Sequence, residues 1–276
     1  MRVAEALALA RRMHVDRIDA QALLSHRLGR PRSWLIAHDD VSLEPADEAA
    51  FRLQLQRRAD GEPLAYIVGH REFRGLDLMV TPAVLVPRPE TEGLVDWALE
   101  CLAGRSAPRV VDLGTGSGAI AVAIAITRTD AEVTAVDCSG AALEVARTNA
   151  LRHRVELRLH QGDWWQAVPA CCYDMAVANP PYIAERDPHL AALAHEPAGA
   201  LIAGVDGLVA LRTVICGAHL HLTPGGWLLL EHGFDQGATV RSLLSDAGFI
   251  DVATRQDLAG LDRCSGGRLP PEATLR

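Results

Sequence analysis

The sequence predicts an α/β protein in which a doubly wound, mainly parallel sheet follows a small helical bundle. Three observations predict this fold class. From Pro108 onward, short apolar runs alternate with segments of helical length, as in sheets whose parallel strands are joined by helices. Residues 1–60 carry apolar residues at helical spacing. Residues 61–90 differ from both, because an alternating stretch around a glycine is followed there by a proline-rich segment.

Residues 1–60 are expected to form three or four short helices. Gly29 and Pro31 are expected to end the second helix, and Pro45, which acidic residues follow, to begin a later one. A bundle of this size either packs on the main domain or docks a macromolecular partner, and composition leaves both open. The apolar residues at helical spacing include Val3, Leu7, Ala10, Met13, Ile18, Ala22, Leu28, Phe51 and Leu55.

The segment between the two domains is expected to be a hairpin and a linker. Residues 71–80 alternate around Gly75, which predicts a β-hairpin. Prolines make residues 86–92 rigid and extended, and Thr91 is expected to cap a helix over residues 92–102. The predicted division of the chain is a helical domain (1–60), a hairpin and linker (61–90) and a larger domain (91–276).

Polar side chains stand where successive strands of the larger domain end. Asp112, Asp137, Asp163 and Asn179 lie at or near the carboxyl ends of the first four predicted strands. Ligands of open α/β sheets bind at this edge, so one shared site is predicted there. The predicted strands are residues 109–113, 132–137, 155–160, 173–178, 226–231 and 249–255, and the predicted helices are about 119–128, 141–151, 207–222 and 236–247. No closing strand is predicted in residues 263–271.

The loop after the first strand matches a cofactor-binding pattern. Residues 114–118 with Ala119 satisfy the spacing of the dinucleotide fingerprint, and Asp137 lies about 20 residues on, where a ribose-binding carboxylate is expected. This pattern alone fits a nicotinamide cofactor as well as S-adenosylmethionine. Asp112 just before the loop, a third glycine within it and the loop at Asn179 favour S-adenosylmethionine.

The segment Asn179-Pro180-Pro181-Tyr182 predicts the kind of group that the site receives. Two prolines fix φ and remove two N–H donors, which makes the loop stiff and extended. Asn179 Oδ1 and the Pro180 carbonyl can each accept one hydrogen of a planar N–H₂ group, and Tyr182 can lie against its face. By itself the loop does not distinguish a nucleic-acid base from a protein amide.

Charge and composition narrow the class of protein. A formal net charge of −8 disfavours a long nucleic acid as the main ligand, because phosphate binding needs a basic face. No apolar run is long enough to cross a bilayer and no signal-peptide layout is present, so a cytoplasmic location is expected. Cysteine and histidine spacing predicts no metal site. Of Trp164 and Trp165, one is expected to edge an adenine, or both to pack in the core.

These motifs resemble those of the bacterial protein-(glutamine-N5) methyltransferases that modify class I peptide chain release factors (the PrmC/HemK family). The resemblance covers nearly the whole chain. The glycine loop and Asn-Pro-Pro-Tyr are shared with enzymes that methylate amino groups of adenine and guanine, whereas residues 88–92 and the helical N-terminal domain are more specific to the release-factor enzymes. The matching segments are residues 61–66, 71–73, 87–92, 112–118, 179–183, 196–197 and 230–233.

The resemblance implies a class I S-adenosylmethionine-dependent methyltransferase fold and methyl transfer to the glutamine of a release factor's Gly-Gly-Gln motif, with the N-terminal domain holding that partner. In the mechanism that this activity requires, Asp112 is expected to organise the glycine loop, and Glu90 and Glu92 are expected to line the amino end of the cofactor. A monomer that binds neither nucleic acid directly nor a membrane is expected. The implied cofactor-binding residues are Gly114, Thr115, Gly116, Ser117, Gly118, Asp137, Trp164 and Asn179. The implied substrate-binding residues are Asn179, Pro180, Pro181 and Tyr182, of which Asn179, Pro180 and Tyr182 are the catalytic candidates.

Two other classes of function remain open at this point. One is an amino methyltransferase that acts on a nucleic-acid base, which the acidic charge disfavours. The other is a non-catalytic module that uses the sheet only to hold a partner. The complete set of glycines, together with Asp137 and Asn179, argues against the second class.

Overall fold

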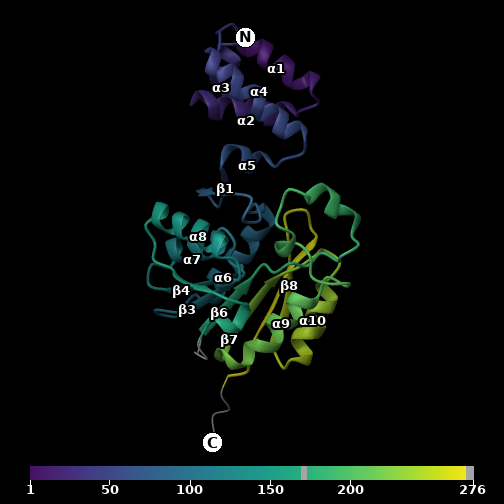
Figure 1. The fold of residues 1–276 in the computed structure, drawn as a ribbon. Coiled ribbons are helices and arrows are strands. Elements are labelled where there is room, and N and C mark those ends of the chain that lie inside the picture. Colours follow the sequence, from purple (N-terminus) through teal and green to yellow (C-terminus); the bar gives the residue numbers. More distant parts are fainter. Residues whose placement is uncertain (169–172, 272–276) are drawn as a thin grey trace, which may run out of the picture. The chain divides into compact units, whose positions relative to one another are not determined.

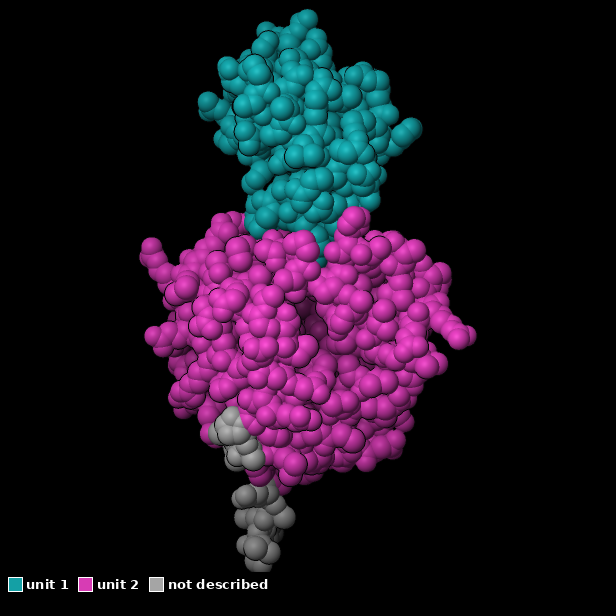
Figure 2. All heavy atoms as spheres, in the orientation of Figure 1, with its two compact units in different colours: residues 1–70 teal, residues 71–276 magenta. Residues whose placement is uncertain are grey.

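The computed structural model describes residues 1–168 and 173–271. The chain divides into two compact units, Met1–His70 and Arg71–Arg276, which Figure 2 shows in different colours. Each unit encloses its own apolar core.

The first unit consists of five helices. Gly29 adopts a φ of 61° and ends the second helix, and Pro45 occupies the first turn of the fourth, so both predictions are confirmed. The last helix begins after Pro63 and ends at Gly69; it is too short for periodicity to predict it. The helices are α1 (Val3–Arg12), α2 (Arg17–Leu28), α3 (Arg32–Ala37), α4 (Pro45–Ala59) and α5 (Leu64–Val68). Fully buried side chains include Leu23, Leu24, Leu35, Phe51 and Leu55.

The second unit is built on a mixed sheet of seven strands in the order β5-β4-β3-β6-β7-β9-β8 (Figure 1). The first five strands in this order pair in parallel, as predicted, and the last two join antiparallel. The strands are β3 (Arg109–Leu113), β4 (Glu132–Asp137), β5 (Arg158–Gln161), β6 (Tyr173–Ala178), β7 (Leu222–Glu231), β8 (Ile250–Gln256) and β9 (Asp262–Arg268). The predicted hairpin is confirmed as β1 (His70–Phe73) and β2 (Leu76–Met79).

The expectation that residues 263–271 hold no closing strand is wrong, because β9 lies between β7 and β8. The sequence of β9 does not predict a strand, because Ser265, Gly266 and Gly267 lack the branched and aromatic side chains that are typical of strands. The glycines are needed for space. A Cβ at Gly266 would lie 2.7 Å from the Leu228 carbonyl oxygen, so the close approach of β9 to β7 excludes a larger residue.

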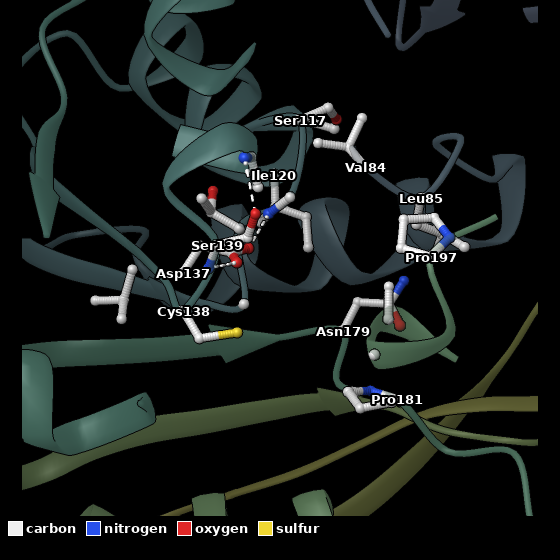
Figure 3. Close-up of a pocket in the computed structure, with 18 of the residues that line it drawn as sticks. Val84, Leu85, Ser117, Ile120, Asp137, Cys138, Ser139, Asn179, Pro181 and Pro197 are labelled. Carbon is white, nitrogen blue, oxygen red and sulfur yellow. Dashed lines mark hydrogen bonds between the residues drawn. The ribbon is translucent and has the colours of Figure 1, made fainter. Parts of the chain in front are cut away.

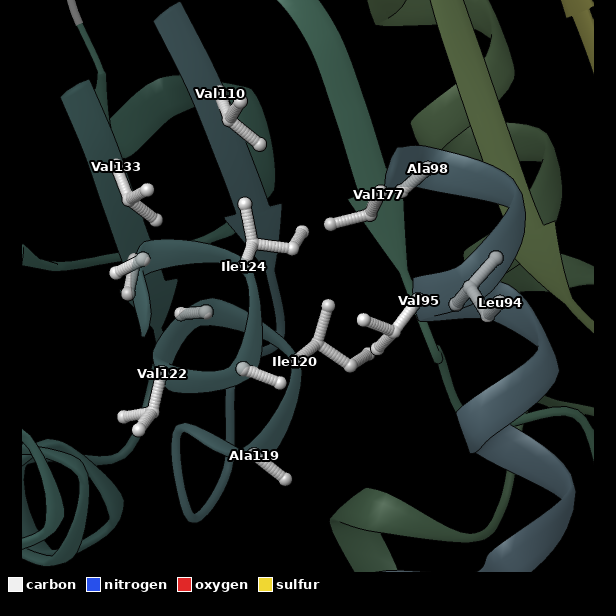
Figure 4. Close-up of a cluster of buried hydrophobic side chains, with 14 of the residues drawn as sticks. Leu94, Val95, Ala98, Val110, Ala119, Ile120, Val122, Ile124, Val133 and Val177 are labelled. Carbon is white, nitrogen blue, oxygen red and sulfur yellow. The ribbon is translucent and has the colours of Figure 1, made fainter. Parts of the chain in front are cut away.

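Helices cover both faces of the sheet. Val110 and Val111 are neighbours on β3, yet they belong to different cores, because successive strand residues point to opposite faces. One core includes α6 (Glu92–Cys101) and α7 (Ala119–Thr127), packed on Val110, Val133 and Val177 (Figure 4). The other includes α9 (Val209–Gly217) and α10 (Gly237–Asp246). The sheet therefore lies between two layers of helices.

Two predicted boundaries shift. The predicted strand at 155–160 begins only at Arg158, because Val155 N–H donates to the carbonyl of Ala150 and closes α8 (Gly140–His153). The helix predicted over 207–222 is divided into α9 and the short η5 (Ala218–Leu220), after which β7 begins at Leu222. In the described part of the chain, no helix is long and apolar enough to span a bilayer.

Candidate functional site

One cavity of about 230 Å³ opens where β3, β4 and β6 end, at the carboxyl edge predicted to carry the site (Figure 3). Asp137 ends β4 and Asn179 follows β6, and both line it together with Asp163. Asp112 does not line it. The predicted site residues that line the cavity are Gly114, Thr115, Gly116, Ser117, Asp137, Trp164, Asn179 and Pro181.

Hydrogen bonds from the end of β4 hold the glycine loop. The N–H of Gly114 donates to the Val136 carbonyl (2.8 Å), and the N–H of Gly116 donates to Oδ2 of Asp137 (2.9 Å). Gly114 has a φ of 74°, and a Cβ there would lie 3.2 Å from the ring of Trp164. Glycine therefore lets this backbone face the cavity without strain and without crowding the indole.

Gly118, the last glycine of the loop, does not line the cavity. It precedes α7 with a φ of 80°, and a Cβ there would lie 3.1 Å from the Cβ of Ala146 on α8. A side chain at this position would strain the backbone and push the two helices apart. Gly118 thus serves the packing of α7 against α8.

Asp112 fastens the loop to the first turn of α7, which is the organising role predicted for it. Its carboxyl group is fully buried, and Oδ2 accepts from the Thr115 hydroxyl (2.7 Å) and from the N–H of Ala121 (3.2 Å). Burial raises the pKa of Asp112 to about 7. Oδ1 is buried without a hydrogen-bond partner among the described residues.

A carboxylate and an indole line the cavity beside the glycine loop. Asp137 Oδ1 accepts from the N–H of Ser139 (2.9 Å), so each carboxylate oxygen holds one backbone donor and retains a lone pair for a ligand. Trp164 lines the cavity, whereas Trp165 is buried and donates its indole N–H to the Val214 carbonyl (2.8 Å). The two tryptophans therefore have different environments, and Trp164 is the one placed to touch a ligand.

Thr91 fixes the amide of Asn179. The Nδ2 group of Asn179 donates to Thr91 Oγ1 (3.2 Å), while Asn179 itself lines the cavity. The prediction that Thr91 caps the following helix is wrong: it stands at the N-cap position of α6, but its side chain makes no capping hydrogen bond. Its Oγ1 instead accepts from Asn179, and its hydroxyl lowers the pKa of Glu231.

Pro180 and Tyr182 do not line the cavity. Pro180 is buried. The Tyr182 hydroxyl donates to Oε1 of Glu231 (3.4 Å), and its carbonyl accepts from Nε2 of Gln236 (3.0 Å). Burial raises the pKa of Tyr182 above its usual range, which keeps the phenol a donor. Pro181 forms the part of the loop that reaches the cavity beside Asn179 (Figure 3).

Sequence reasoning gave no role to an ion pair at the cavity. Arg88 lines the cavity and pairs with Glu196, which is buried and also accepts from the N–H of Val86 (3.1 Å). Both residues lie in segments that match the release-factor methyltransferases, and this match is the sequence feature that could have identified them. Glu92, expected near the cofactor, instead accepts from the N–H of Arg74 (3.0 Å) and does not line the cavity; nor does Glu90.

The strand order, with one antiparallel strand inserted next to the last in the sheet, and the glycine loop at the end of β3 define a class I methyltransferase fold. Solved structures with this fold include the hMettl16 catalytic domain (TM-score 0.59, 14% identity, 86% of each chain). Another is the Thermus thermophilus 16S rRNA N2 G1207 methyltransferase (TM-score 0.55, 19% identity, 72% of this chain and 49% of that one). At these identities the likeness shows the fold alone.

Sequence comparison is more specific. Residues 3–69 match the PrmC N-terminal domain, and residues 96–198 match the methyltransferase small domain. A release factor glutamine methyltransferase of Bordetella pertussis is 54% identical over 92% of this chain and 96% of its own length. One of Burkholderia pseudomallei is 51% identical over 97% of both chains. The chain belongs to the release factor glutamine methyltransferase family.

Proposed function

We propose that this protein transfers a methyl group from S-adenosyl-L-methionine to the side-chain amide nitrogen (N5) of the glutamine in the Gly-Gly-Gln motif of class I peptide chain release factors, and so modulates translation termination. The observation that carries the proposal is the position of Asn179. Its amide faces the same cavity as the glycine loop, in a chain that is 54% identical to a release factor glutamine methyltransferase. The relatives favour neither a nucleic-acid base as the substrate nor a binding role without catalysis.

The cavity fits S-adenosylmethionine. Asp137 offers free carboxylate lone pairs where the ribose hydroxyls would bind, and the absence of a Cβ at Gly114 leaves room between the loop and Trp164. Trp164 and Asp163 form the wall that would receive the adenine. When bound, this cofactor supplies a methyl group on positively charged sulfur.

Asn179 and Pro180 orient the substrate amide in this mechanism. An amide nitrogen is a poor nucleophile, because its lone pair is delocalised into the carbonyl. Asn179 Oδ1 and the Pro180 carbonyl accept hydrogen bonds from its two N–H groups. These hydrogen bonds orient the nitrogen toward the methyl group and stabilise the positive charge that develops on it. These two acceptors would hold the amide nitrogen in line with the methyl group that bound S-adenosylmethionine would supply, and the amide proton would leave to water. The ring of Tyr182, which does not line the cavity, would border the glutamine from the end of the same loop.

The first unit is proposed to hold the release factor. Residues 3–69 match the PrmC N-terminal domain, and the exposed apolar side chains on its helices include Ile18, Ile36 and Leu53. Exposed apolar side chains of this kind are available for contact with a protein. This assignment predicts that the first unit contributes to affinity for the release factor and not to cofactor binding.

Transfer of labelled methyl groups to a purified release factor tests the proposed function. The wild-type factor should become labelled, and a factor whose Gly-Gly-Gln glutamine is replaced by alanine should not. Equal labelling of both factors would place the methyl group elsewhere. Absence of labelling of either factor, with S-adenosylmethionine bound in calorimetry, would exclude the release factor as the substrate.

A further inference from the structure

A single buried carboxyl group joins both ends of the Asn-Pro-Pro-Tyr loop. Glu231, the last residue of β7, is 1% exposed. Its Oε1 accepts from the hydroxyl of Tyr182 (3.4 Å), at one end of the loop. Its Oε2 is buried without a hydrogen-bond partner among the described residues, and the Thr91 hydroxyl is the further donor group that acts on this carboxyl group. Thr91 Oγ1 accepts from Nδ2 of Asn179 (3.2 Å), at the other end of the loop.

The hydrogen-bond donors and acceptors between Glu231, Thr91 and Asn179 follow one another in a single direction. An ionised carboxylate only accepts hydrogen bonds, so Glu231 draws the single hydroxyl hydrogen of Thr91 toward itself. Thr91 Oγ1 then offers a lone pair to Asn179, which must turn its N–H₂ group to that oxygen. The carbonyl oxygen of Asn179 is consequently directed away from Thr91, with its lone pairs available to a ligand.

We propose that Glu231 and Thr91 are positioning residues, which set the amide of Asn179 so that its oxygen, and not its N–H₂ group, meets the substrate glutamine. This inference rests on the proposed function, since it concerns how the same site receives an amide. A reversed Asn179 would present donors to a substrate nitrogen that is itself a donor, and the glutamine would lose an acceptor. Neither positioning residue needs to touch the reacting atoms.

The protonation of Glu231 makes the arrangement sensitive to pH. Burial raises its pKa to about 7, while the donors Thr91 and Tyr182 and the charge of Arg263 act in the opposite direction. Glu90 adds a repulsive charge, and the Cys264 thiol, opposite Glu231 on β9, has a raised pKa and is neutral. Below neutral pH the protonated carboxyl group of Glu231 can donate to Thr91, and the direction of these hydrogen bonds is then no longer fixed.

The sequence offers a direct measurement, because Asn149 and Asn179 are the only two asparagines in 276 residues. Selective ¹⁵N labelling of asparagine gives two side-chain amide signals. In the wild-type protein the Asn179 signal should shift with a midpoint near pH 7. Glu231→Gln should remove this titration, and Thr91→Val should move the Asn179 signal at every pH. Asn149, bound to the carbonyls of Met79 and Ser117, is the internal reference.

Kinetics provide the second test. Thr91→Val keeps the shape of the side chain and removes the hydroxyl, and it should lower kcat about tenfold, the scale of one lost hydrogen bond. The dissociation constant of S-adenosylmethionine should change less than about threefold. Thr91→Ser should restore most of the rate. Thr134→Val, which removes a buried hydroxyl bonded to Tyr173 away from the cavity, is the matched control and should keep the wild-type kcat.

The outcomes separate this inference from the proposed function. An unchanged Asn179 signal and an unchanged kcat in Thr91→Val would overturn the inference while release-factor methylation stands. A titrating Asn179 signal that Glu231→Gln abolishes would support the positioning network even if no release factor were methylated, and the substrate alone would then need revision. A loss of kcat matched by Thr134→Val would show a general packing effect and would also overturn the inference.

Discussion

The two loops that line the cavity are held in different ways. The glycine loop is fixed by residues close to it in the fold: β4 supplies acceptors to its N–H groups, and Asp112 binds Thr115 only three positions on. The Asn-Pro-Pro-Tyr loop is fixed by side chains from distant segments, Thr91 before α6 and Glu231 at the end of β7. The first loop therefore depends on backbone conformation and the second on side-chain contacts across the sheet, and substitutions should separate cofactor binding from turnover.

The largest expected effect on this separation is that of Asn179→Ala. The substitution removes a preorganised acceptor for the substrate amide, so kcat should fall about 10²-fold or more. The dissociation constant of S-adenosylmethionine should stay within about threefold of the wild-type value in calorimetry. Asn149→Ala is the counterpart, because Asn149 donates to the Ser117 carbonyl of the glycine loop (2.8 Å), and it should weaken cofactor binding instead. If both variants changed kcat and the dissociation constant of S-adenosylmethionine in the same way, the separation of cofactor binding from turnover would be contradicted.

Glu231→Gln should next change how stability depends on pH. The pKa of Glu231 is raised from 4.5 to about 7 in the folded protein, so between these values the folded state keeps a proton that the unfolded state has released. The free energy of unfolding due to this group therefore falls as pH rises through that window, by about 3 kcal/mol in all. Urea unfolding at pH 5 and pH 8 should show that Glu231→Gln gains stability relative to the wild type only at the higher pH. A gain of equal size at both would show that Glu231 does not titrate in this range.

Asp137→Asn tests the cofactor side directly. The amide keeps an acceptor for Gly116 but loses the charge that strengthens a hydrogen bond to a ribose hydroxyl. The dissociation constant of S-adenosylmethionine should rise about tenfold, with kcat at saturating cofactor nearly unchanged. Asp174→Asn is the control. Asp174 lies on β6 at the end away from the cavity, and its carboxylate binds Arg105 and the N–H of Arg109. A fall in kcat without a change in affinity would assign Asp137 to the chemistry.

Gly118→Ala should have the smallest effect on the site. The new Cβ would lie 3.1 Å from Ala146 on a backbone with a φ of 80°, so stability should fall by about 1–2 kcal/mol. Affinity for S-adenosylmethionine at a temperature well below unfolding should change by less than about threefold. A larger loss of affinity with normal thermal stability would return Gly118 to the cofactor-binding residues.

Sequence patterns predicted what depends on local physics. The glycine loop, the parallel strands and the strand-end residues Asp137 and Asn179 follow from residue type and spacing, and the structure places both residues at one cavity. Thr91 shows where such reasoning ends. A threonine before a helix favours a cap, and only the fold brings Asn179, 88 positions away, to its hydroxyl. β9 shows the same limit, because its place between two strands requires glycines that a strand pattern does not favour.

The position of β9 also imposes an order on biosynthesis. β7 and β8 leave the ribosome before residues 262–268, yet neither pairs with the other, because β9 lies between them. A nascent chain that ends before this segment has two strand edges without partners, and such edges favour association with other chains. Glu231 is paired with Cys264 of the late strand, so the carboxyl group beneath the substrate loop gains its final environment only when the last strand is inserted. The site is therefore complete only after β9 has formed. A ribosome that stalls shortly before codon 262 would yield a product that is inactive and prone to aggregate.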